Sequence, residues 1–217
     1  MTSDPSRALD DEVAGCAAAH QRLLATLDEA AAAAAIGPIA PSLLPDWTIG
    51  HVLTHVARNA DAFRHMIEGA AVGETRLMYP SAQHRDDDIN RGAGRALEVL
   101  VGDVRNSIWA LESSWARLSS VGWSGHGLTR IGKVPVTSIP WRRWREVELH
   151  HADLGLGFTT ADWSPAFIAQ DLARRLEEWT SEPNTLPAEV GSAQPWQQLA
   201  WLLGRPSGLS TPSPGWG

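Results

Sequence analysis

Apolar residues recur at helical spacing along the chain up to about residue 155, and clusters of glycine and proline interrupt them. The first such segment is rich in alanine and offers Val13, Leu23, Leu24 and Leu27 for a buried face. Residues that favour helix starts precede the segments, and glycine closes several of them. The pattern predicts four long helices, over about residues 4–35, 48–69, 81–118 and 138–155.

Shorter elements complete the prediction. Two short β-prone segments, residues 128–131 and 134–136, flank Gly132 and Lys133 and indicate a hairpin over residues 128–136. Short helices are expected over about residues 164–180 and 195–204, and the Pro/Ser/Gly-rich tail 206–217 is expected to be disordered. A change in pattern near Thr160 predicts two domains, 1–160 and 161–217. The predicted fold class is mainly α: an up-down four-helix bundle with a short β-hairpin insertion and a small C-terminal domain.

Composition narrows the function classes. The 217 residues carry a net charge of -7 without a basic stripe, which argues against a nucleic-acid partner. Cys16 is the only cysteine, so neither an intramolecular disulfide nor a cysteine-based zinc site is expected. The acidic N-terminus lacks the features of a signal peptide, and no apolar run predicts a membrane span. We therefore expect a cytoplasmic protein that acts away from membranes. We also expect it to be a monomer.

A carboxylate and an imidazole lie four residues apart in the fourth predicted helix, at Glu146 and His150. Residues at this spacing share one helix face, so both side chains can reach the same metal ion. His55, in the second predicted helix, is the candidate third ligand. A His/Glu/His set can hold zinc and leave a fourth position open, which is typical of a catalytic site. The same donors also suit nickel, iron or manganese.

Neighbouring residues compete for these roles. Glu148 and His151 are three residues apart on another face of the helix, which we expect to be solvated or to flank the site. His51 lies one turn before His55 and is interpreted as a capping or packing residue. Spacing alone is a weak signal, because many surface helices carry Glu and His four residues apart.

Three further residues are candidates for supporting the site. Arg143 lies three residues before Glu146, and its guanidinium suits a substrate carboxylate. The alternative is that Arg143 forms ion pairs on the bundle surface. Asn59 lies one turn after His55, and Asp153 lies one turn after His150, where it could orient the imidazole ring from the outer coordination shell. Ordinary polar packing near a helix end is the alternative for Asp153.

At these positions the chain resembles the mycothiol-dependent maleylpyruvate isomerases, a family within the DinB-like metalloenzyme superfamily. The matching segments are Leu44–Thr48, His55–Asn59, Met78–Ser81, Arg145–Val147 with His150, Asp153–Gly155 and, more loosely, Leu203–Arg205. The resemblance implies a DinB-like helical bundle that holds zinc through the positions of His55, Glu146 and His150. It also implies a small C-terminal domain whose arginine, at the position of Arg205, is catalytic and binds substrate. Between Trp179 and Trp196 the chain is shorter than this pattern, with little room for strands.

The resemblance implies that the chain converts maleylpyruvate to fumarylpyruvate in aromatic catabolism, with Zn²⁺ and mycothiol as cofactors. In such an isomerisation a thiolate adds to the cis double bond and the electrons pass into the conjugated carbonyl as an enolate. The resulting single bond rotates, and loss of the thiolate restores a trans double bond. Two alternatives stay open. One is a zinc-dependent S-transferase that adds mycothiol or another small thiol to a different electrophile, and the other is a non-catalytic metal-binding module.

Overall fold

The computed structural model describes residues 5–33, 37–181 and 184–214. The chain divides into two compact units, residues 1–156 and residues 157–217. The domain boundary predicted near Thr160 falls inside the second unit. Nearly all the regular structure is helical, as the sequence predicts, and a single two-stranded hairpin is present in the described part of the chain.

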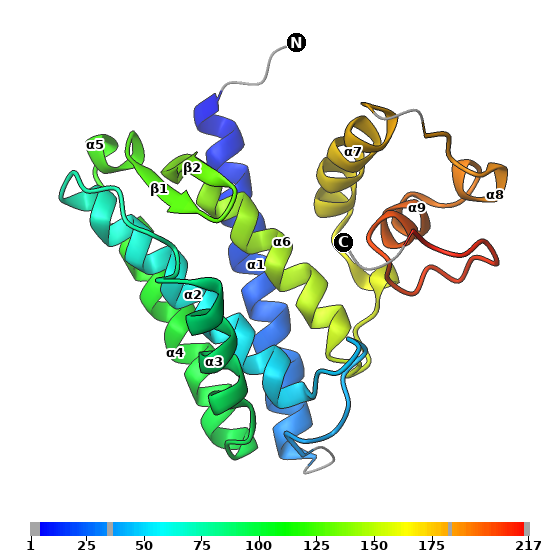
Figure 1. The fold of residues 1–217 in the computed structure, drawn as a ribbon, viewed down its shortest axis with the longest axis horizontal. Coiled ribbons are helices and arrows are strands. Elements are labelled where there is room, and N and C mark those ends of the chain that lie inside the picture. The colour runs from blue at the N-terminus through cyan, green and yellow to red at the C-terminus, as the bar shows by residue number, and fades with distance from the viewer. Residues whose placement is uncertain (1–4, 34–36, 182–183, 215–217) are drawn as a thin grey trace. The chain divides into compact units, whose positions relative to one another are not determined.

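Four long helices, α1, α2, α4 and α6, form the bundle of the first unit, and the shorter helix α3 packs on α2 (Figure 1). Two contacts show that α1 and α6 run in the same direction (Figure 1). Gly15 lies against Trp144, and further along both helices Thr26 contacts His151. α2 packs against α3, α4 and α6. The predicted start of the first helix at Asp4 and its predicted end near Ala35 lie outside the described residues. The bounds are α1 (Pro5–Ala32), α2 (Ile49–Ala71), α3 (Ala82–Ala93), α4 (Leu97–Ala116) and α6 (Ile139–Asp153).

The segment predicted as one helix over residues 81–118 is instead two helices, α3 and α4, and the prediction of continuity was wrong. α3 leads the chain back along α2, because Gly50 near the start of α2 faces the backbone carbonyl of Ala93 at the end of α3. α4 then runs parallel to α2, and Gly122 beyond α4 lies against Ala71 at the end of α2. The chain turns at Gly94, where the low helix propensity of glycine favours a break.

The predicted hairpin is present after the short helix α5 (Ser120–Trp123). Strands β1 (His126–Thr129) and β2 (Gly132–Pro135) are antiparallel, and the 3-10 helix η1 (Val136–Ser138) leads into α6. β1 also holds the segment that precedes α3. The backbone N–H of Leu128 donates to Arg76 O at 2.9 Å, and the N–H of Met78 donates to Leu128 O at 2.8 Å. These bonds fix the backbone immediately before Tyr79.

The second unit contains the 3-10 helix η2 and three α-helices. Residues 157–181 and 184–214 contain no β-strand, in agreement with the little room that the sequence offers for strands. The tail was predicted to be disordered, but the part at residues 206–214 is bonded to the unit. Trp201 Nε1 donates to Thr211 O at 3.1 Å, and Glu189 accepts from the backbone N–H of Ser210. The bounds are η2 (Thr160–Asp162), α7 (Pro165–Ser181), α8 (Ala188–Gly191) and α9 (Pro195–Leu202).

The core of the first unit is built around α2. Val52, Leu53 and Val56 are at most 1% exposed, as are Leu23 of α1 and Leu111 of α4. Burying each such side chain contributes roughly 1.5–3 kcal/mol. Because neighbours cover α2 on several sides, polar residues on it are also buried and need partners inside the bundle. None of the helices in residues 5–33, 37–181 and 184–214 combines the length and the hydropathy that a membrane span requires.

Candidate metal centre

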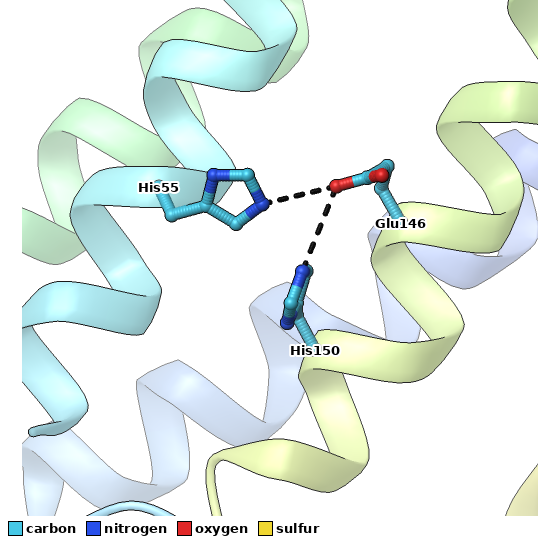
Figure 2. Close-up of side chains that lie close together, drawn as sticks. All are labelled: His55, Glu146 and His150. Atoms are coloured by element: carbon cyan, nitrogen blue, oxygen red, sulfur yellow. Dashed lines mark hydrogen bonds and ion pairs between the residues drawn. The ribbon is translucent and has the colours of Figure 1, made fainter. Parts of the chain in front are cut away.

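His55, Glu146 and His150 come together inside the bundle (Figure 2). Each offers one ligand atom, and these atoms all lie within 4.8 Å of one another. One carboxylate oxygen of Glu146, Oε2, lies 3.0 Å from His55 Nε2 and 3.6 Å from His150 Nε2. His55 comes from α2, and the other two residues come from α6, one turn apart. The structure thus brings together the three side chains that the sequence singles out as ligands.

Local structure at the start of α2 fixes the position of His55. Thr48 caps the helix: its hydroxyl oxygen accepts from the backbone N–H of His51, and His51 Nδ1 accepts from the backbone N–H of Thr48. His51 therefore has the capping role that the sequence suggests for it. The ring of Trp47 meets the His55 ring edge-on at a centroid distance of 5.6 Å, and the His55 and His150 rings are 4.6 Å apart. His55 is only 4% exposed.

The three side chains differ in protonation. Burial lowers the pKa of His55 to about 4, so its ring is neutral at neutral pH. Burial alone would raise the pKa of Glu146, but hydrogen bonds with His150 and His55 outweigh it and hold that pKa well below its ordinary value. Burial likewise opposes the charge on His150, yet hydrogen bonds with Asp153 and Glu146 raise its pKa. The cluster therefore contains an ionised carboxylate between two imidazoles.

Asp153 lies where the sequence predicts a supporting residue. Its Oδ2 is 3.0 Å from His150 Nδ1, and the side chain is 1% exposed. A carboxylate at Nδ1 fixes the proton on that nitrogen and leaves Nε2, which faces Glu146, for a metal ion. Asn59 is also buried, and its support of the candidate ligands stays a prediction. Its side-chain oxygen accepts a hydrogen bond from Arg143 Nη1 at 2.8 Å, so it supports that arginine.

Arg143 is buried, which argues against the predicted contact with substrate and against the surface ion pair. Its side chain is 0% exposed. Its Nε donates to His20 Nε2 at 3.0 Å, and its Nη1 donates to Val56 O at 2.9 Å as well as to Asn59. His20 Nδ1 in turn lies 2.8 Å from Glu112 Oε1. Arg143 thus links α6 to α1 and α2 through hydrogen bonds. These hydrogen bonds offset the cost of burying its charge inside the bundle.

The second Glu/His pair of α6 also lies inside the protein. The sequence suggests that Glu148 and His151 are solvated or flank the site, but both are 1% exposed and face α1. Glu148 Oε1 accepts from Arg22 Nη2 at 2.6 Å, and His151 Nε2 lies 2.9 Å from Thr26 Oγ1. These contacts join α1 to α6 on the face turned away from His55, so this pair is structural.

Sequence reasoning missed Arg85 and Tyr79. Arg85, on α3, places Nη2 at 3.3 Å from His55 Nδ1. The buried hydroxyl of Tyr79 has no well-aligned hydrogen bond to any residue that the structure describes. Burial raises the pKa of Tyr79 to about 12, and the negative charge of Glu146 raises it too, whereas Arg85 lowers it. The signal for Tyr79 was the matching segment Met78–Ser81; no pattern singled out Arg85.

The chemistry of the donor set fits a metal ion such as zinc. Two imidazoles, which can bind a metal in their neutral form, and one ionised carboxylate face a common point. Three protein ligands leave a fourth coordination position of zinc for another group. Asp153 supplies the outer hydrogen bond that metal-binding histidines commonly make. Close by, Trp47 also lines a cavity of about 420 Å³ formed by residues of the Ile39–Thr48 segment.

Arg205 lies in the second unit, just after α9. It is 7% exposed, and its Nη1 donates to the backbone oxygen of Leu203 at 2.7 Å. Its backbone N–H donates to Ala200 O at 2.8 Å, which fixes the turn after the helix. These contacts show how the unit holds Arg205; its role toward a substrate stays a prediction.

The fold and the cluster define a class of protein: a helical bundle with a candidate His/Glu/His metal centre on two facing helices. Within that class, the chain belongs to the family described as the mycothiol maleylpyruvate isomerase N-terminal domain, whose model matches residues 13–155. All three candidate ligands lie inside the matched region. The family that the sequence resembles is thereby confirmed.

Solved structures agree with this assignment. The chain is similar to a crystal structure of the mycothiol-dependent maleylpyruvate isomerase, with a TM-score of 0.82 and 25% identity over 96% of this chain and 97% of that one. A histidine-to-alanine mutant of that enzyme matches with the same TM-score at 24% identity and with the same coverage. No curated protein matches the sequence significantly.

Proposed function

We propose that the protein is a zinc- and mycothiol-dependent cis–trans isomerase that converts maleylpyruvate to fumarylpyruvate. One observation carries the proposal: a His/Glu/His cluster with all its ligand atoms within 4.8 Å, in a chain of the maleylpyruvate isomerase family. The similarity in fold to the mycothiol-dependent isomerase over nearly the whole of both chains supports it.

Each residue of the cluster has a defined task in this proposal. His55, Glu146 and His150 hold the zinc ion, and Asp153 orients the His150 ring through Nδ1. Zinc, when bound, favours the thiolate form of a thiol and polarises a substrate carbonyl as a Lewis acid. Arg205 is proposed to bind a substrate carboxylate and to stabilise the negative charge that develops on the enolate oxygen. Cys16 is 0% exposed and burial raises the pKa of its thiol, so the nucleophilic sulfur is that of mycothiol.

The proposal is tested by incubating the zinc-loaded protein with maleylpyruvate, with and without mycothiol, while fumarylpyruvate and free thiol are followed together. Trans product at constant thiol is the expected result. Thiol consumption without trans product would indicate the S-transferase, and no reaction would indicate a metal-binding module.

Glu146→Gln isolates the contribution of the cluster. Removal of the charged ligand should reduce zinc affinity by at least about tenfold and abolish turnover at limiting zinc. Glu148→Gln is the matched control, because Glu148 is the other glutamate of α6 and bonds to Arg22 and Trp144 instead. It should lower stability while the folded protein still binds zinc. Equal zinc affinity in Glu146→Gln and wild type would contradict the assignment of the ligand.

A further inference from the structure

Arg85 and Tyr79 lie beside the candidate metal centre, and the functions assigned above leave both unused. We propose that they form the anion-binding part of this site, and that Arg85 turns from His55 to a substrate carboxylate when His55 binds metal. The class of ligand, a small carboxylate such as an α-keto acid, rests on the proposed function. The placement of the two side chains does not depend on it.

Rigid local structure places both residues. The backbone before Tyr79 is bonded to β1 through Arg76 and Met78. Ser81 then caps α3, where its hydroxyl oxygen accepts from the backbone N–H of His84 at 3.0 Å. Arg85 follows one turn after the cap, on the side of α3 that meets His55. The hairpin, the cap and α3 thus act together to hold these side chains at the centre.

The contact between Arg85 and His55 is compatible with only one form of the ring. A guanidinium only donates hydrogen bonds, so His55 Nδ1 must accept and the ring proton must sit on Nε2, facing Glu146 Oε2. A metal ion on Nε2 would replace that proton, and a neutral ring would then carry its proton on Nδ1. Two N–H groups would face each other, and Arg85 would lose its acceptor. Metal binding therefore favours a new acceptor for Arg85.

The surroundings favour an anion as that acceptor. The Arg85 side chain is 30% exposed, so solutes can reach it. Arg85 Nη1 also donates to Asp86 Oδ1 at 2.7 Å. The Asp86 side chain is more than half exposed, and exposed ion pairs contribute little binding energy. The buried Tyr79 hydroxyl can donate a hydrogen bond to the same ligand. Arg143, which is buried, adds a second positive charge whose field reaches the Tyr79 hydroxyl.

The experiment measures binding without turnover, with maleate as the probe and no thiol present. Calorimetry on the zinc-loaded protein should give at least about a tenfold weaker affinity for Arg85→Gln, because a charge-assisted hydrogen bond is lost. Tyr79→Phe should weaken binding by about two- to tenfold. Arg91→Gln is the matched control, since Arg91 lies on the same helix, is exposed and forms an ion pair with the half-buried Asp88. This control should bind maleate as the wild type does.

Two comparisons separate this role from a merely structural one. Arg85→Gln should leave zinc affinity unchanged or increase it, because it removes a cation beside a ligand. The loss of maleate affinity should be large with zinc and small in protein stripped of metal, where Arg85 stays engaged by His55. Reduced zinc affinity, equal losses with and without zinc, or wild-type maleate affinity in the variant would each overturn the proposal. Isomerase activity in a wild type that binds no maleate would overturn it too, while leaving the proposed function intact.

Discussion

Burial lowers the pKa of His55, so its ring is neutral at neutral pH. The ring would therefore not have to lose a positive charge before it bound a metal ion. His150 differs, since Asp153 and Glu146 hold a proton on it more firmly than in a free imidazole. A metal ion held by His150 would displace the proton that this ring directs at Glu146, and the bond from Nδ1 to Asp153 would remain. On this proposal, Asp153 would set both the orientation of His150 and its strength as a ligand.

Removal of that carboxylate should weaken metal binding. In Asp153→Asn the ring of His150 loses its charged partner, and zinc affinity should fall about 10- to 100-fold, measured by competition with a chromophoric chelator. Asp103→Asn is a suitable control because Asp103 pairs with Arg58 and Arg95, away from the ligands. If both variants bind zinc equally well, Asp153 has no role in supporting the ligand.

His20 should make the protein sensitive to acid. Burial lowers the pKa of His20 from 6.5 to about 4, although its bond with Glu112 opposes the shift. Between these pH values the unfolded chain binds a proton that the folded protein does not, so the free energy of unfolding falls as pH drops from 6.5 to 4. The loss is on the order of 1–3 kcal/mol.

The measurement is urea unfolding of wild type and His20→Gln between pH 4.5 and 7.5, with chelator present to remove metal. His55 contributes in both proteins, so the difference between them isolates His20. The variant should show a shallower decline in stability toward low pH. Parallel curves for the two proteins would show that the protonation of His20 does not differ between the folded and unfolded chains.

At the scale of elements, the close approach of α2 and α3 determines what reaches His55. A Cβ at Gly50 would overlap the backbone oxygen of Ala93, and a Cβ at Gly92 would overlap the side chain of Thr54. These two glycines let the helices meet backbone to backbone. α3 can then bring Arg85 within hydrogen-bonding distance of His55.

Gly50→Ala should therefore destabilise the protein by about 2 kcal/mol or more, because a backbone carbonyl cannot move aside as a flexible side chain can. Gly102→Ala in α4 is the opposite case: a Cβ there meets nothing within 4 Å, and the helix should gain about 0.5–1 kcal/mol. Chemical denaturation of both variants checks the pair. Similar stability changes of the same sign would contradict the close contact between α2 and α3.

Helix α6 shows what can and cannot be predicted from a sequence. Glu146 and His150 were predictable because one helical period relates them, and the ends of α6 follow from Pro140 and Gly155. Contacts between helices carry no such periodic signal. The burial of Arg143 depends on His20 and Asn59, which lie on two other helices, and nothing near Arg143 in the sequence indicates them.

The break between α3 and α4 was equally hard to foresee. Gly92 and Gly94 indicate a weak point in the predicted helix, yet glycine alone does not say whether a helix bends or ends. The outcome depends on how α3 packs on α2, because the chain must return along α2 before α4 can start. The same break places Arg85 at the site, so missing it also meant missing that residue.

At the scale of the whole molecule, the candidate metal ligands and their supporting carboxylate belong to one unit. His55, Glu146, His150 and Asp153 all lie in residues 1–156, as does the region that matches the family model. The second unit has its own contacts, including the edge-on rings of Trp179 and Trp201 and the bonds from Glu189 to the tail. A metal ion should therefore stabilise the two units unequally.

Hydrogen–deuterium exchange with and without zinc tests this expectation. Zinc at 100 times its dissociation constant stabilises the state that binds it by about 2.7 kcal/mol, which corresponds to roughly 100-fold slower exchange for amides that exchange through opening of that unit. The slowing should appear in α2 and α6, whereas α7 and α9 should exchange at nearly the same rate in both samples. In Glu146→Gln, an at least about tenfold loss of zinc affinity should reduce this slowing by roughly tenfold or more at the same zinc concentration. Equal slowing in both units of the wild type would show that they open as one cooperative body, and the metal would then control the stability of the entire chain.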